Sequence, residues 1–85
     1  MGLVNRVVAT DELKTYVMEL AGTIAANAPL TVKASKFIVS QCCLDPEKRD
    51  MDKVAGMVEA CFQSEDYKEG ARAFMEKRKP AFEGR

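Results

Sequence analysis

The C-terminal stretch SEDYKEGARAFMEKRKPAFEGR contains the side chains of this sequence that are best suited to bind a ligand. On a helix, Phe74 lies three residues before Lys77 and four before Arg78, so an aromatic ring and two cations share a face. The ring can cover an adenine, and the lysine ammonium can neutralise a phosphate as a point charge. Because residues 72–79 carry more cations than anions, this pattern predicts a clamp for the phosphate of a nucleotide.

A structural role explains the same residues without any ligand. Cations near the C-terminus of a helix offset the helix dipole. Phe74 also continues an apolar stripe that includes Tyr67 and Ala71 at helical spacing. The cluster has neither a glycine-rich loop nor a base-reading motif beside it, so the residues alone favour this structural role over the clamp.

We assign no catalytic residue and no metal ligand. The chain has no histidine, which excludes histidine-based catalysis and histidine-ligated metals. Four glutamates lie in predicted helices without a companion that would complete an acid–base pair: Glu12, Glu19, Glu59 and Glu69. We therefore expect these four carboxylates to lie on solvated surface.

The three cysteines, Cys42, Cys43 and Cys61, show no CxxC spacing, and adjacent cysteines rarely bridge each other. We expect all three to be buried thiols that act as small apolar residues, in a reducing compartment such as the cytoplasm.

The 13 basic and 13 acidic residues balance, which disfavours binding to nucleic acid or to an anionic membrane surface. No apolar run is long enough to form a membrane helix.

The elements that must position the clamp are predicted to be helices, so the fold class is mainly α. Apolar residues recur at helical spacing in four segments: one N-capped by Thr10, one from Pro29 to about Cys43, one that starts near Pro46 and includes residues 51–62, and one capped by Ser64. Gly70, inside the last helix, costs about 1 kcal/mol relative to alanine. This cost indicates that a neighbouring segment packs there too closely for a β-carbon.

The start of the chain is predicted to be different. GLVNRVV (Gly2–Val8) is apolar and β-branched, which is typical of a short strand. A strand must pair its N–H and C=O groups with a neighbour, and no second strand is predicted in this sequence. We therefore expect its partners in sequence that is missing from this chain.

Taken together, GLVNRVV, ANAPLTVKASK and the C-terminal stretch resemble the C-terminal part of the enoyl-CoA hydratase/isomerase (crotonase) superfamily. The most specific part is the series SE…EG..AF.EKR.P.F.G at Ser64–Gly84. The resemblance covers essentially the whole chain but corresponds to about the last third of a typical member. It implies that residues 1–9 are the last strand of a missing crotonase core, and that residues 10–85 are the helical region that packs subunits into trimers or hexamers.

The resemblance also implies roles for two residues. In the family, the phenylalanine and the first lysine of AF.EKR reach the coenzyme A that is bound in a neighbouring subunit, near its adenine and 3′-phosphate. Here these residues are Phe74 and Lys77. The resemblance thus favours the clamp for these two residues and for no others, with an acyl-CoA thioester as the substrate of the intact enzyme and no tightly bound cofactor.

Hydration of an enoyl thioester needs carboxylates and an oxyanion hole, and both lie upstream of the matched region in the family. We therefore expect this chain alone to be inactive. The resemblance implies that it is the C-terminal portion of an acyl-CoA enzyme. We expect that enzyme in the cytoplasm, or in the mitochondrial matrix of a eukaryote. The alternative is an independent helical interaction module without a ligand. A nucleic-acid binder is disfavoured by the balanced charge.

Overall fold

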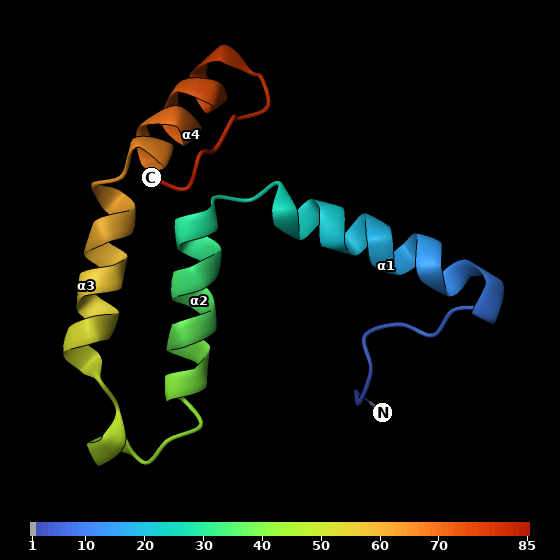
Figure 1. Ribbon diagram of the computed structural model, residues 1–85, viewed down its shortest axis with the longest axis horizontal. Helices are drawn as coiled ribbons and strands as arrows, with labels where there is room; N and C mark the ends of the chain where they lie inside the picture. The colour runs from blue at the N-terminus through green and yellow to red at the C-terminus, as the bar shows by residue number, and fades with distance from the viewer. Residues whose placement is uncertain (1) are drawn as a thin grey trace.

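The computed structural model describes residues 2–85, and these residues form helices and no strand. In chain order the elements are α1 (Thr10–Ala25), α2 (Pro29–Gln41), the 3-10 helix η1 (Pro46–Lys48), α3 (Met51–Phe62) and α4 (Glu65–Glu76). Figure 1 shows α2 and α3 side by side, α4 beyond the end of α3, and α1 projecting away from all three. The mainly helical fold class is confirmed.

The predicted strand at Gly2–Val8 is not formed in this chain: residues 2–9 contain bends and irregular backbone. A strand is stable only when its backbone groups pair with a neighbour, and the described residues offer none. Arg6 instead places its guanidinium carbon 4.8 Å from the centre of the Tyr16 ring, which holds the segment loosely against α1.

The helix starts follow local capping rules. Ser64 caps α4 as predicted, since its hydroxyl accepts a hydrogen bond from the Tyr67 N–H at 3.0 Å. Asp50 caps α3 in the same way, through the Lys53 N–H at 3.0 Å. The prediction for α1 was wrong by one residue: Ala9 is the N-cap, and Thr10 is already helical and makes no capping bond.

The connection between α2 and α3 also differs from the prediction. Helix α2 ends at Gln41, two residues before Cys43, and Pro46 opens the short η1 instead of α3. At this end the Arg49 Nε donates to the carbonyl oxygens of Gln41 at 3.1 Å and Leu44 at 3.2 Å. The Gln41 carbonyl also accepts the Leu44 N–H at 3.1 Å, so Arg49 adds a second donor at the helix end and ties the following loop to it.

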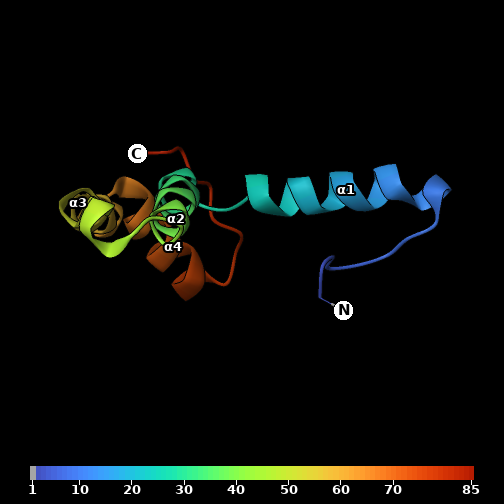
Figure 2. The same cartoon turned by 90° about the horizontal axis from the view of Figure 1, so that it is seen from below.

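Little of the chain is buried. The two buried apolar residues among residues 2–85 are Ala34 on α2 and Ala73 on α4. Lys53 of α3 lies 4.5 Å from the ring centre of Phe37 on α2, which joins these two helices on one side. Figure 2 shows the molecule as a flat group of helices with α1 extending from it. No residue of α1 is buried.

The dimensions show how open this arrangement is. The radius of gyration is 16.5 Å, whereas a compact domain of this length has about 12 Å. The accessible surface is 7335 Å², whereas a folded monomer of this mass exposes about 5,000 Å². The apolar faces of the helices therefore remain largely uncovered by the chain itself.

The cysteines do not behave as predicted. Cys42 and Cys43 are exposed and Cys61 is half-buried, so the expectation of three buried thiols is wrong for the chain alone. All three are free, as predicted. The cause is the open packing: Cys42 and Cys43 follow the end of α2 in the loop, and Cys61 of α3 lines a groove that is open to solvent.

Candidate functional site

Residues 77–85 fold back along α4 and form what we call the C-terminal strap. Its far end is held by Asp66, whose carboxylate accepts the backbone N–H groups of Glu83 at 2.8 Å and Gly84 at 2.7 Å. The Asp66 N–H in turn donates to the carbonyl oxygen of Arg85 at 2.8 Å. The side chain is charged yet Asp66 is only 3% exposed, so these bonds replace the water that the carboxylate has lost. Figure 1 shows the strap returning to the start of α4.

The near end of the strap is held by Glu69. Its carboxylate accepts two hydrogen bonds from the Arg78 guanidinium, from Nη1 at 2.6 Å and from Nη2 at 3.0 Å, and a third from the Ala81 N–H at 2.8 Å. The bonds from Arg78 and then Ala81 lower the pKa of Glu69 from 4.5 to about 2. The prediction of a solvated Glu69 was therefore wrong, since its side chain is 15% exposed.

Lys77 ends α4 with an unusual backbone. Its φ of 55° lies in the left-handed region, and it is the one non-glycine residue with positive φ among residues 2–85. Its N–H donates to the Phe74 carbonyl at 3.3 Å, and the Arg78 N–H donates to the Ala73 carbonyl at 3.0 Å. This pair of bonds is a Schellman motif. Glycine usually occupies this position, because the left-handed conformation costs an L-residue about 1–2 kcal/mol.

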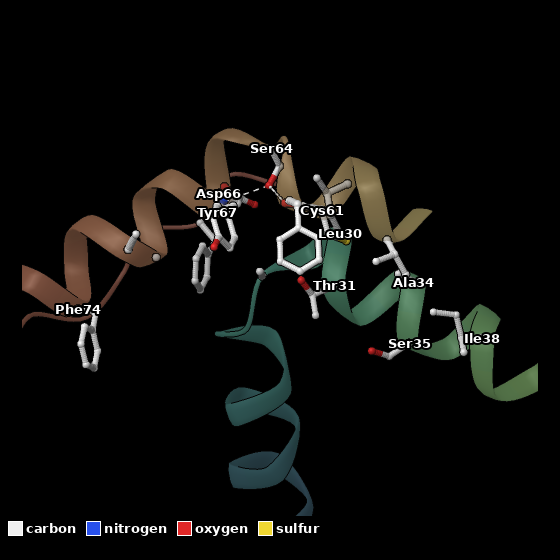
Figure 3. Close-up of a pocket in the computed structure, with 16 residues that line it drawn as sticks. Leu30, Thr31, Ala34, Ser35, Ile38, Cys61, Ser64, Asp66, Tyr67 and Phe74 are labelled. Atoms are coloured by element: carbon white, nitrogen blue, oxygen red, sulfur yellow. Dashed lines mark hydrogen bonds between the residues drawn. The ribbon is translucent and has the colours of Figure 1, made fainter. Parts of the chain in front are cut away.

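The Lys77 side chain has no ion-pair partner among residues 2–85. Phe74, one turn earlier, is 83% exposed. Figure 3 shows its ring standing apart from the other labelled side chains, at the far end of α4. Both predicted site residues are thus at the same end of the same helix and open to a ligand.

The basic cluster is weaker than the sequence suggested. Arg78 does not share the exposed face of Phe74: its guanidinium binds Glu69 and also Glu76, with Nε to Oε2 at 2.5 Å. Arg72 lies 3.6 Å from Glu69. Two of the predicted cations are therefore offset by carboxylates. Lys77 and Lys79 are the cations of this cluster that lack such a partner in the part of the chain that the structure describes.

Gly70 faces the strap. A β-carbon built there would lie 3.6 Å from Cε1 of Phe82 and 3.8 Å from its Cζ. A segment does pack against the helix at Gly70, as predicted. However, a separation of 3.6 Å is ordinary van der Waals contact, so the prediction that a β-carbon would not fit was wrong.

An apolar groove runs between α2, α3 and α4, with a volume of about 600 Å³. Figure 3 shows Leu30, Ala34 and Ile38 following one another along α2 on one side of it, and Tyr67 and Phe74 along α4 on the other. Phe62 and Tyr67 meet edge to face, with ring centres 5.4 Å apart. The groove is open to solvent in this chain and is lined almost entirely by carbon.

Residues 2–85 contain no group of three or more potential metal-ligating side chains. Over the same residues, every helix is too short or too polar to cross a membrane.

Asp66 and Glu69, the two carboxylates that hold the strap, were not predicted from the sequence to act together. The signal available in the sequence was their spacing of three residues, which places them on neighbouring positions of one helix face.

The sequence matches the enoyl-CoA hydratase/isomerase family over residues 1–85. It is 36% identical over 86 residues to methylmalonyl-CoA decarboxylase of Escherichia coli K12, covering 99% of this chain and 33% of that protein. It is 40% identical over 82 residues to the short-chain-enoyl-CoA hydratase of Clostridium acetobutylicum, covering 93% of this chain and 30% of that protein. The chain thus spans about a third of the length of these relatives.

The fold agrees with this relationship. The crystal structure of a probable enoyl-CoA hydratase/isomerase from Mycobacterium abscessus superposes with a TM-score of 0.81 at 40% identity, over 99% of this chain and 33% of that one. An enoyl-CoA hydratase from Mycobacterium tuberculosis H37Rv gives a TM-score of 0.82 at 34% identity, with the same coverage. The open arrangement of helices is therefore one that longer, related proteins adopt over about a third of their chains. The chain belongs to the enoyl-CoA hydratase/isomerase family.

Proposed function

We propose that these 85 residues act as the C-terminal region of an acyl-CoA enzyme, where they join subunits into a trimer or hexamer and form one edge of the coenzyme A site. The observation that carries this proposal is the uncovered surface: 7335 Å² are exposed, against about 5,000 Å² for a compact monomer of this mass. Many of the exposed side chains are large and apolar, and uncovered apolar surface of this kind marks an interaction surface. A crotonase core that contributes neighbouring strands to residues 1–9 would cover part of it.

The names of the relatives support coenzyme A as the shared ligand. They include a methylmalonyl-CoA decarboxylase, a short-chain-enoyl-CoA hydratase and a carnitinyl-CoA dehydratase, so the acyl group and the reaction differ while the coenzyme is constant. A region that is 36–40% identical in all three is better suited to bind the constant part of the substrate. Within this chain, the exposed Phe74 and the unpaired Lys77 are the side chains suited to adenine and phosphate.

For the whole protein, we propose hydration of a 2-enoyl-CoA in fatty acyl-CoA metabolism. The 85 residues alone should not catalyse it. The reaction needs carboxylates to position water and move a proton, and N–H groups to stabilise the thioester oxyanion. Within residues 2–85, Glu12, Glu19 and Glu59 are exposed, and the carboxylate of Glu69 is occupied by Arg78 and Ala81. Loss of the enoyl absorbance of crotonyl-CoA in the presence of the purified 85-residue chain would refute this part.

The coenzyme site is tested by Lys77→Gly in the complete protein that carries this region. Glycine keeps the left-handed backbone at this position and removes only the side chain. Loss of one charged contact to phosphate costs about 1.5–3 kcal/mol, so the Kd of coenzyme A, measured by calorimetry, should rise about tenfold or more. The Kd of 3′-dephospho-coenzyme A should change little. An equal change for both ligands would remove Lys77 from the site.

The alternative, a helical module that binds a protein partner and no ligand, predicts a different outcome. It would leave coenzyme A binding unchanged in Lys77→Gly. It also predicts that the 85-residue chain is a monomer with a cooperative unfolding transition. Our proposal predicts self-association of the chain alone through its uncovered apolar faces, which sedimentation velocity measures directly.

A further inference from the structure

We propose that Glu69, acting through Arg78, is a positioning residue for coenzyme binding: it fixes the backbone from which the Lys77 side chain leaves the helix. The inference rests on the proposed function, because it concerns the same coenzyme edge. Glu69 does not itself contact the ligand in this proposal. Its role is to hold the C-terminal strap so that Lys77 keeps one direction.

The first step is the backbone of Lys77. A lysine with φ of 55° occupies a conformation that L-residues rarely adopt, so this geometry persists only where the surrounding structure enforces it. On its N-terminal side, Lys77 is fixed by α4 through the bond from its N–H to the Phe74 carbonyl. On its C-terminal side, the 3.0 Å bond from the Arg78 N–H to the Ala73 carbonyl fixes the backbone, and the strap fixes the direction in which the chain continues.

The second step is how the strap is held. Arg78, the next residue, gives two parallel hydrogen bonds to the two carboxylate oxygens of Glu69, at 2.6 and 3.0 Å. A two-point bond between planar groups fixes orientation as well as distance. The Ala81 N–H adds a third bond to the same carboxylate at 2.8 Å. One side chain on α4 therefore holds the chain both one residue and four residues after Lys77.

The third step is the charge of Glu69, which decides in which direction its removal should change the affinity for the phosphate. Glu69 is an anion near the predicted phosphate site, and it offsets the cations Arg78 and Arg72. If only charge mattered, removing this carboxylate would leave more positive potential and strengthen phosphate binding. If Glu69 positions Lys77, removing the carboxylate weakens binding. The two explanations predict changes in opposite directions.

The test uses Glu69→Gln, which has the same shape and removes the charge, in the complete protein that carries this region. The matched control is Glu65→Gln, because Glu65 is an acid on the same helix that pairs with Lys68 at 2.9 Å and makes no bond to the strap. The measurement is the calorimetric Kd for coenzyme A and for 3′-dephospho-coenzyme A. The same values are measured in the Lys77→Gly background, to complete a double-mutant cycle.

We expect Glu69→Gln to raise the Kd of coenzyme A about three- to tenfold, a typical coupling between residues of one network. The Kd of the dephospho ligand should stay near its wild-type value, and Glu65→Gln should change neither. In the Lys77→Gly background, Glu69→Gln should have no further effect. Arg78→Lys, which keeps the charge and loses the two-point bond, should behave like Glu69→Gln.

Tighter binding in Glu69→Gln, an unchanged Kd, or an equal effect with and without Lys77 would each overturn the positioning role. An equal effect on both ligands would do so too, because it would show general destabilisation. A failure of the proposed function can be told apart from these results. If the coenzyme site does not include this region, Lys77→Gly itself would leave the Kd of coenzyme A unchanged.

Discussion

The first and last helices of this chain are held by different means. Helix α1 has no buried residue, and its apolar side chains Leu13, Val17 and Ile24 are each 50% exposed. Helix α4 is shorter, yet it buries Ala73 at 1% exposure and is tied to the C-terminal strap through Asp66 and Glu69. The strap makes α4 a locally closed unit, whereas α1 presents an apolar face to solvent.

The difference shows which contacts the chain supplies for itself. A helix with half-exposed apolar residues gains most of its stability only when another surface covers them. Under the proposed function, α1 would gain its stability from the rest of the acyl-CoA enzyme, while α4 and the strap keep their geometry without it. Such a self-supporting unit would suit the proposed coenzyme site, which needs Phe74 and Lys77 in a fixed arrangement.

The largest expected difference between the two regions is in hydrogen exchange of the 85-residue chain. An isolated helix of 16 residues is marginal in water, so at concentrations low enough to keep the chain monomeric the amides of α1 should exchange almost as fast as in an unfolded peptide. The two bonds at Asp66 alone are worth about 3 kcal/mol or more, so the amides of Glu83 and Gly84 should exchange about a hundredfold slower. Equal exchange rates in α1 and the strap would contradict the comparison.

The next effect comes from Asp66→Ala. This change removes the acceptor for two backbone N–H groups, and each hydrogen bond to a charged group contributes about 1.5–3 kcal/mol. The free energy of opening of the strap, measured by exchange of the Gly84 amide, should therefore fall by about 3 kcal/mol or more. Asp11→Ala is the matched control, because Asp11 is also the second residue of its helix but holds no strap. Asp11→Ala should lower the stability of α1 by the helix-dipole contribution alone, about 0.3–1 kcal/mol.

These two regions also show how far the sequence could predict the structure. The start of α4 and most of α2 follow from local signals, such as the Ser64 cap and Pro29 in the first turn. The strap could not be predicted, because Asp66 bonds to residues 17 and 18 positions away and no periodic pattern records such contacts. The strand at Gly2–Val8 failed for a related reason: strand formation depends on a partner and not on residue type alone.

The candidate site was predicted only in part, because residue type and helical spacing do not record a change of backbone conformation such as that at Lys77. Phe74 and Lys77 were identified by type and spacing, and the structure leaves both exposed, while their role toward coenzyme A stays a prediction. Arg78 was assigned to the same face because helical spacing was assumed to continue past residue 76. The left-handed turn at Lys77 breaks that spacing and directs Arg78 to Glu69.

A pH titration probes the near end of the strap. The pKa of Glu69 is lowered from 4.5 to about 2 by Arg78 and the Ala81 N–H. A lowered pKa in the folded state means that the stabilisation is complete above pH 4.5 and is lost as the pH falls through about 2. The strap should therefore stay attached at pH 4. Carbon-detected NMR of the Glu69 carboxyl, with its midpoint near 2, measures this.

The control for the titration is Arg78→Gln. Removing the guanidinium should return the Glu69 midpoint toward 4.5 and detach the strap at a higher pH. Glu65, whose pKa is lowered chiefly by its hydrogen bond from Lys68, should titrate at the same pH in both proteins. A Glu69 midpoint that does not move in Arg78→Gln would show that the ion pair does not hold the strap in solution.

The smallest expected effect is that of replacing one glycine by alanine in each of the two regions. In Gly70→Ala, the new β-carbon meets Phe82 at 3.6 Å, an ordinary contact, and in Gly22→Ala of α1 it meets nothing within 4 Å. Each change should therefore stabilise its helix in the 85-residue chain by up to about 1 kcal/mol, measured by circular dichroism and exchange. In the complete protein, Gly70→Ala should keep its gain, because the strap already fills the space around it. Gly22→Ala should lose its gain if a partner surface packs on α1, and a persistent gain there would show that this side of α1 is free.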